Sequence, residues 1–488
     1  MNTFNRKTLY AALAGLGAIG ATGAVEAVNL NPDGLGQVLI YPYYTVRSNG
    51  SGFAYNTLLS VVNSTGSAKA VKVRFLEGKN SQEVLDFNLF LSGHDVWTAA
   101  ITSNALGGAS VSSSDKSCIL PSQLAATGQP FVNFLYATDG ADATLDRTRE
   151  GYVEIIEMGI YPDNSTTSIA VTHVGGVPPG CAGGVTDSTV LNDTLASSES
   201  LTLSGGLFGA VTLINVLEGS AYSQNATALD QFKDFGSIYF NAGDPKPTLN
   251  NVSPATSVVV AKGSAVITAW STATPIDAVS AVLMHDSVIN EYVTEPSILA
   301  NTDWVVTMPT KNRYVSVGTG AALPPFQKNF DGTKGACDDV TVTTWDREEL
   351  KPSTPGGFSP PQPGKKSNLC WEANVITFLP VGVLGSTNNK LVGGIGLNNQ
   401  INGWAQLAFV YSGAKLIGGL TTTVDLLNGG TTSFPVDATY AGLPVVGFAV
   451  QAYNNNLIVV NGKNIQSTYG ADFGHRFTTK VTPGLLAP

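Results

Sequence analysis

Charged residues are scarce in this chain of 488 residues, because they make up only 13% of it. That is about half of the share found in ordinary soluble domains. The charges that remain are mostly negative and give a net charge of −10, without a cluster of basic residues. The composition therefore argues against nucleic acid as a partner. It also argues against binding to anionic membrane surfaces by charge.

Catalytic motifs are missing as well. The chain lacks the G-x-S-x-G turn of serine hydrolases, the H-E-x-x-H zinc motif and the EF-hand loop. It has four histidines, of which His94 and His285 are each followed by an aspartate. Adjacent residues of a strand point to opposite faces, so such pairs do not act together there. We expect no enzymatic activity, no catalytic residues and no cofactor apart from the calcium ion considered below.

Cysteine is rare, with four residues that predict two disulfides in an exported chain. Three pairings are possible. We favour Cys118–Cys181 and Cys337–Cys370, because each bond then lies within one half of the chain. No two cysteines have the C-x-x-C spacing, which gives little support to zinc or redox roles.

Long apolar runs are confined to the N-terminus. Residues 1–27 have the pattern of an export signal, in which Arg6 and Lys7 precede an apolar segment that leads to a cleavage site after Ala27. We therefore expect an exported protein, located at the cell surface or outside the cell, or associated with the outer membrane. No later stretch has the roughly 18 apolar residues of a membrane helix, so we expect no transmembrane helix.

A hydrophobic period of two dominates the rest of the chain. Val71, Val73 and Phe75, for example, alternate with Lys72 and Arg74. Similar patterns recur between turn signals and are typical of half-buried antiparallel strands. The sequence thus predicts a mainly β protein made of antiparallel β-sandwich domains, either immunoglobulin-like or jelly-roll-like, with few short helices.

Helical signals are few. Residues 225–235 predict a short helix with Asn225 or Thr227 as its cap. Residues 275–289 are ambiguous between helix and strand.

Two polar segments suggest how the chain is divided. Residues 187–206 are rich in Ser and Thr, and residues 351–367 are rich in Pro and Gly. The second segment lies between two cysteines, so we expect a surface excursion tied between paired strands and not a linker. The expected parts are a signal at 1–27, an N-terminal β domain at 28–200 and a C-terminal β region at 201–488, as one unit or as two sub-domains.

Acidic residues gather in a predicted loop that holds Asp139, Asp142 and Asp146. Their oxygens could converge on a calcium ion. The alternate spacing of calcium ligands is absent, however, and Arg147 and Arg149 lie close by in the sequence. We therefore favour a solvated acidic turn with local ion pairs, and calcium binding is the alternative.

Glu154 and Glu157 follow in a predicted strand, where they fall on opposite faces. One of them could therefore face inward. A buried carboxylate would then need a partner such as an arginine.

The stretch GLGQVLIYPYYTV, residues 34–46, is aromatic and contains a proline. Because Pro42 cannot donate a ladder hydrogen bond, we expect an edge strand or a bulged strand. We favour a strand of the protein's own first sheet, with half-buried tyrosines. The alternative is donor-strand exchange with a neighbour, in which Tyr41, Pro42, Tyr43 and Tyr44 form an assembly strand.

Several stretches resemble a family of exported proteins of Gram-negative bacteria that are described as cell-surface or uncharacterised proteins. The resemblance covers most of the chain and implies an envelope or extracellular location. It supplies no catalytic residues to carry over to this chain. The stretches are DGLGQVLIYPYYTV, FNLFLSGHDVWTAAI, RTREGYVEIIEMG, NTDWVVTMPTKNRYV, LCWEANVITFLP, GLPVVGFAVQAY and YGADFGHR.

These observations favour an exported cell-surface protein with a structural, adhesive or assembly role and no catalytic activity. The expected partners are copies of the protein itself or other components of the cell envelope. Two alternatives remain open. One is an outer-membrane β-barrel, although the chain ends in VTPGLLAP without a terminal aromatic strand. The other is a secreted hydrolase or glycan-binding protein.

Overall fold

The computed structural model is built mainly from antiparallel sheets with few short helices, as the sequence predicts. Of the expected signal segment, only Glu26 and Ala27 belong to the described part of the chain. Within that part, no helix combines the length and the apolar character needed to cross a membrane. The structure describes residues 26–49, 54–181, 183–197, 204–234, 238–349, 367–391, 401–409, 411, 413–425, 431–434 and 437–483.

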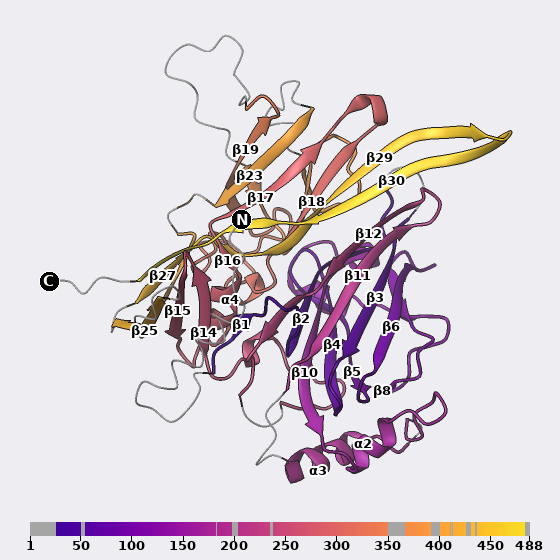
Figure 1. Ribbon diagram of the computed structural model, residues 1–488, viewed down its shortest axis with the longest axis vertical. Helices are drawn as coiled ribbons and strands as arrows, with labels where there is room; N and C mark the ends of the chain where they lie inside the picture. The colour runs from indigo at the N-terminus through magenta and orange to yellow at the C-terminus, as the bar shows by residue number, and fades with distance from the viewer. Residues whose placement is uncertain are drawn as a thin grey trace.

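Two sheets from the N-terminal half pack face to face (Figure 1). Leu39 and Phe75 of the first sheet and Trp97 of the second sheet share one hydrophobic core. The strand order of the first sheet is β1 (Asn29–Leu30), β13 (Thr227–Asp230), β2 (Val38–Thr45), β10 (Glu150–Tyr161), β4 (Ala68–Glu77), β5 (Glu83–Leu91) and β8 (Cys118–Leu120). The order of the second is β12 (Ser220–Asn225), β11 (Leu207–Asn215), β3 (Asn56–Asn63), β6 (Val96–Ser103), β7 (Ala109–Ser112) and β9 (Gln129–Pro130).

The C-terminal half forms two larger sheets and several smaller ones (Figure 1). One larger sheet has the order β20 (Ser367–Leu369), β19 (Asp338–Asp346), β23 (Asn402–Phe409), β17 (Ser287–Val293) and β31 (Arg476–Thr478). The other has β22 (Asn389–Leu391), β21 (Ala373–Thr377), β18 (Asn301–Thr307), β29 (Val446–Val460) and β30 (Lys463–Gly474). The smaller sheets are β14 (Thr256–Ala261), β15 (Ser264–Ala269), β25 (Thr421–Asp425) and β26 (Thr431–Phe434); β24 (Lys415–Gly418), β27 (Ala438–Ala441) and β32 (Lys480–Pro483); and β16 (Met284–His285) with β28 (Leu443–Pro444).

The helices are short and lie between the strands. The α-helices are α2 (Thr166–Val171), α3 (Asp187–Ser197) and α4 (Ile276–Leu283). The 3-10 helices are η1 (Phe134–Thr138), η2 (Leu145–Arg149), η3 (Leu249–Asn251), η4 (Pro296–Ile298) and η5 (Lys311–Arg313).

The first sheet is covered on both faces. Leu39 of β2 faces the second sheet, whereas Val38 and Ile40 join a core that also contains Trp304 of β18 and residues of α4. Every residue of β2, β4 and β10 is therefore buried. A simple two-layer sandwich would leave alternate residues in water. Here the charged residues at those alternate positions are enclosed instead.

Strand β2 contains the predicted assembly residues, and the structure places them inside the chain's own first sheet. Val153 of β10 lies opposite Tyr41, and Gly151 lies opposite Tyr44. Pro42 and Tyr43 thus form a bulge, which confirms the bulged alternative, whereas the edge-strand alternative is wrong because β13 and β10 flank β2. The tyrosines are fully buried and not half buried. They are core residues of the chain's own sheet in this structure.

The expected boundary at residue 200 does not separate two sets of strands. β11 pairs with β3, and β13 pairs with β2, so residues 207–230 return to the N-terminal sheets. The short helix predicted at 225–235 is also wrong. β13 occupies part of this range, because pairing with β2 outweighs a weak helical propensity. The ambiguous residues 275–289 form α4 followed by strands.

Both predicted disulfides are confirmed. Cys118 is bonded to Cys181, and Cys337 is bonded to Cys370. The second bond joins the region where β19 pairs with β20. This pairing agrees with the expected paired strands, and most of the excursion at 351–367 lies outside the described residues.

Candidate functional site: a buried ionic network

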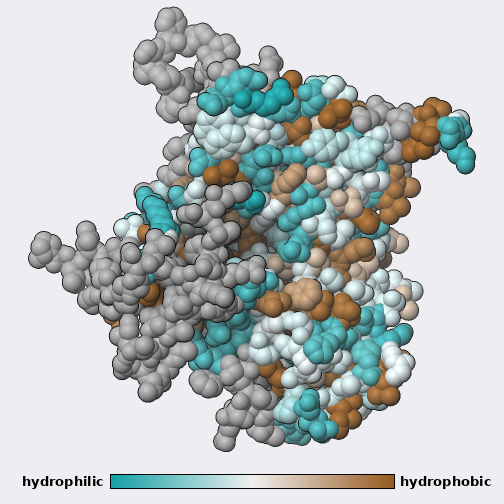
Figure 2. Space-filling model, viewed as in Figure 1, coloured by the Kyte–Doolittle hydropathy of each residue, from teal (hydrophilic) through white to brown (hydrophobic). Residues whose placement is uncertain are grey.

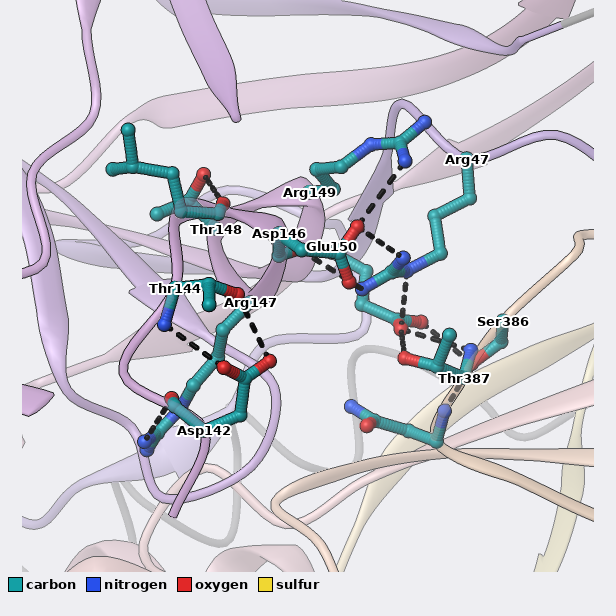
Figure 3. Close-up of polar contacts among 12 residues, drawn as sticks. Arg47, Asp142, Thr144, Asp146, Arg147, Thr148, Arg149, Glu150, Ser386 and Thr387 are labelled. Carbon is teal, nitrogen blue, oxygen red and sulfur yellow. Dashed lines mark hydrogen bonds and ion pairs between the residues drawn. The ribbon is translucent and has the colours of Figure 1, made fainter. Parts of the chain in front are cut away.

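The three aspartates predicted as calcium ligands lie between η1 and β10 and serve separate partners. Asp146 forms an ion pair with Arg47, with 3.0 Å between Oδ2 and Nη2. Asp142 is exposed and accepts hydrogen bonds from the backbone N–H and the hydroxyl of Thr144 (Figure 3). Asp139 is buried beside a different arginine, so a solvated turn is the wrong description for it. The structure therefore does not bring these carboxylates together, and no group of three metal-ligating side chains occurs among the described residues.

Glu150, the first residue of β10, is the centre of one cluster (Figure 3). Its carboxylate accepts hydrogen bonds from Arg47 Nε and from the Tyr43 hydroxyl, each at 2.7 Å. The hydroxyls of Ser386 and Thr387 also donate to it. Burial alone would raise the pKa of Glu150, but the charge of Arg47 and these hydrogen bonds hold it below its ordinary value. An ionised carboxylate thus joins β10 to a segment more than 200 positions later in the chain.

Arg147 is the centre of a second cluster. Its Nε and Nη2 donate to the two carboxylate oxygens of Glu77, each at 2.8 Å. Its Nη1 donates to Asp139 at 3.0 Å, and the guanidinium lies 4.3 Å from the centre of the Tyr136 ring. The side chains of Arg147, Glu77 and Asp139 are all fully enclosed. Two-point contacts of this kind are among the stronger hydrogen bonds in proteins, and their loss would leave a buried charge without compensation.

Glu154 and Glu157 of β10 are both buried, whereas the sequence required only one of them to face inward. Glu154 pairs with Arg74, and Glu157 pairs with Lys69. Burial raises the pKa of each glutamate above its ordinary value, although the neighbouring cation opposes this effect. Both cations come from β4, which lies beside β10 in the first sheet. The predicted need for a basic partner is confirmed.

Two further buried carboxyl groups have incomplete hydrogen bonding. Asp303 accepts a hydrogen bond from the backbone N–H of Leu384 at 2.9 Å, while its Oδ1 has no partner. Glu372 likewise has one oxygen without a partner. Burial raises the pKa of Asp303 to about 7 and that of Glu372 to about 8. Both groups are expected to hold protons at a pH where exposed carboxyl groups are ionised.

Ser92, Asp95 and His173 bring together the residue types of a nucleophilic triad. Ser92 Oγ lies 3.3 Å from His173 Nδ1, and Asp95 Oδ2 lies 3.6 Å from the same nitrogen. A triad places the hydroxyl and the carboxylate on opposite nitrogens of the imidazole. This group therefore does not have the geometry that activates a serine.

Comparison with known proteins assigns no role to these residues. No protein-family model matches the chain, and no curated protein is significantly similar to it. The arginines and lysines of the network pair with carboxylates of other strands and loops. The role of this arrangement is therefore to hold these segments together.

A second candidate surface is the long hairpin of β29 and β30, which no sequence pattern marked as a prominent feature. The two strands pair up to a tight turn at Asn461 and Gly462, both of which have positive φ. Asn-Gly is the preferred pair for such a turn. Among the described strands, β18 accompanies β29 only as far as Ala452. Beyond that residue the hairpin extends away from the body, past β12 (Figure 1). We call residues 453–469 the arm.

Apolar side chains are exposed along the arm and at its base. Ile465, Tyr469 and Phe473 are 44%, 61% and 39% exposed, and their spacing places them on the same face of β30. Val459 is 69% exposed. Figure 2 shows hydrophobic residues near the outer end of this hairpin. Such a surface is typical of an interaction site, because water-exposed apolar patches carry a free-energy cost that a partner removes.

Proposed function

We propose that this protein is exported and acts at the cell surface as a non-enzymatic structural subunit that assembles with copies of itself or with other envelope components. The observation that carries the proposal is the arm, which displays apolar side chains away from the body. Val459, Ile465 and Tyr469 of the arm are exposed and are not packed in the chain's own core, so contact with a partner is the role that they suggest.

The rest of the molecule is suited to such a role. The two disulfides indicate an oxidising, extracytoplasmic location. The buried ion pairs tie loops and strands of distant sequence to one another, which favours a single rigid shape. The export pattern at residues 1–27 and the resemblance to exported cell-surface proteins support the same proposal.

Surface labelling of intact host cells tests this function. A membrane-impermeant biotin reagent is applied to the cells, and the labelled protein is then separated by native electrophoresis, with a cytoplasmic protein as the unlabelled control. We expect the protein to be labelled and to migrate as assemblies. Recovery in the unlabelled fraction, or labelling only of a monomer, would contradict the proposal.

A further inference from the structure

The arm is held rigidly at its base. The carboxylate of Asp472 in β30 accepts hydrogen bonds from the backbone N–H of Ser223 and from the side chain of Gln224, both in β12. Gly470 lies so close to β12 that a Cβ atom there would come within 2.8 Å of the Tyr222 ring. The arm therefore leaves the body at a fixed position. These contacts restrict the orientation of the arm relative to the body, which lowers the entropy that binding a partner costs.

The arm is almost uncharged. Between Tyr453 and Tyr469 the sequence has a single charged residue, Lys463 at the turn. From Tyr453 to Val460, at roughly 3.3 Å per residue, the arm reaches roughly 25 Å. That length is sufficient to insert several side chains into a neighbouring molecule.

An open groove lies on the outer side of the second sheet. It has a volume of about 590 Å³ and is lined by small or apolar uncharged residues that include Leu58, Ser60, Thr98, Ala100 and Ala210. Leu58 and the nearby Phe208 are more than 40% exposed. Small side chains leave depressions into which branched and aromatic side chains fit, and a groove of this volume accommodates a few of them.

We propose that the arm of one copy docks in the outer groove of a second copy. This inference rests on the proposed function and names the partner and the surfaces. The chain carries a net charge of −10, so most approaches between two copies are opposed by repulsion. The arm, whose single charge is Lys463, and the groove, whose lining residues are uncharged, carry no negative charge, so two copies can meet there without burying like charges.

The contact is of the head-to-tail kind, because two different surfaces of the molecule meet. Each copy then offers a vacant arm at one side and a vacant groove at the other. Repetition of such a contact produces an open filament or a closed ring, according to the rotation between copies. This is the assembly that a surface layer or fibre requires.

The first test compares two double variants in protein expressed from the full-length sequence. The variant I465S/Y469S removes apolar side chains from the arm, and the control L106S/L217S removes two others that are each 66% exposed elsewhere. Light scattering over a concentration series measures assembly, and thermal unfolding checks the fold. We expect the arm variant to need at least ~10-fold more protein for assembly, in line with the loss of one or two central interface residues. The control should assemble like the wild type.

The groove is tested by Thr98→Arg, which places a large charged side chain on the exposed floor. We expect the same loss of assembly without a change in thermal unfolding.

A mixture of two single-cysteine variants then identifies the contact directly. All four native cysteines are in disulfides, so an introduced thiol has no native thiol to compete with it. Ile465→Cys mixed with Thr98→Cys should give a cross-linked dimer in large excess over the dimers that either variant forms alone.

The outcomes separate this inference from the proposed function. If the wild-type protein stays monomeric at every concentration, the inference fails together with the self-assembly form of the proposed function, and only assembly with other envelope components remains of that function. If it assembles and the arm and groove variants assemble equally well, only the arm-in-groove contact is wrong. Binding of the wild type to phosphatidylethanolamine–phosphatidylglycerol vesicles, lost in I465S/Y469S while assembly is unchanged, would assign the arm to lipid and overturn the inference.

Discussion

At the scale of single residues, burial distinguishes ion pairs that stabilise the fold from ion pairs that contribute little to stability. Arg147 and Arg149 lie two positions apart, yet their surroundings differ. Arg147 is fully enclosed with Glu77 and Asp139, whereas the Arg149–Asp146 pair is 26% and 45% exposed. Water and salt screen the second pair and not the first.

We predict that Arg147→Met lowers the free energy of unfolding by about 3–5 kcal/mol, because two carboxylates would remain buried without their cation. The matched substitution Arg149→Met should cost at most about 1 kcal/mol. Denaturant unfolding of both variants measures the difference. Equal losses in the two variants would show that enclosure does not set the strength of these pairs.

The carboxyl group of Asp303 makes stability depend on pH. Its pKa is about 7 in the folded protein, against an ordinary value of 3.8. Between these pH values the folded protein keeps a proton that the unfolded chain has lost. Stability therefore falls as the pH rises from about 4 to about 7 and changes no further above that range on account of this group.

Asp303→Asn should remove this loss, because an amide cannot ionise and its oxygen can still accept the hydrogen bond of Leu384. We predict that the variant is more stable than the wild type at pH 8, by an amount of the order of a few kcal/mol, and similar to it at pH 4. Glu150→Gln should instead be less stable than the wild type at neutral pH and similar to it in acid. The pKa of Glu150 is lowered, so its contribution is present at neutral pH and is lost in acid. A pH-independent difference for Asp303→Asn in unfolding experiments would refute the prediction.

At the scale of elements, the sequence was sufficient for the fold class and for many strands. The alternation in residues 71–75 predicts a strand, and β4 is that strand. The cysteine pairing followed from keeping each bond within one half of the chain. Pro42 correctly indicated an irregular strand, because a residue without an N–H interrupts the ladder.

The errors at this scale come from long-range packing, which local patterns do not encode. Lys72 and Arg74 have the spacing of solvent-facing residues, but every residue of β4 is buried. Both cations pair with carboxylates of the neighbouring strand β5. The local pattern at 225–235 predicts a helix where residues 227–230 form a strand, because the partner strand β2 lies almost 190 positions earlier. Asn461–Gly462 indicates a hairpin, but nothing local indicates that this hairpin extends beyond the body.

The acidic loop illustrates the same limit for the candidate site. Spacing suggested that Asp139, Asp142 and Asp146 could share one ion. The arginines that engage two of them come partly from elsewhere in the chain, since Arg47 precedes Asp146 by 99 positions. Which carboxylate meets which cation is decided by sheet topology, and this information is not available from the loop itself.

At the scale of the whole molecule, net charge and apolar contact have opposite effects on assembly. The charge of −10 repels copies over a Debye length, which is about 30 Å at 0.01 M salt and about 8 Å at 0.15 M. Salt screens this repulsion and leaves apolar contacts in place. We therefore predict that the protein concentration needed for half-assembly falls several-fold when salt rises between these values.

Light scattering at the two salt concentrations measures this effect, with I465S/Y469S as the control that should remain mostly monomeric in both. The sign of the change is decisive, because a contact made by ion pairs would weaken when salt is added. Assembly that dissolves at 0.15 M salt would mean that charged residues hold the copies together. The arm, with its single lysine, and the uncharged groove would then not be the surfaces that meet.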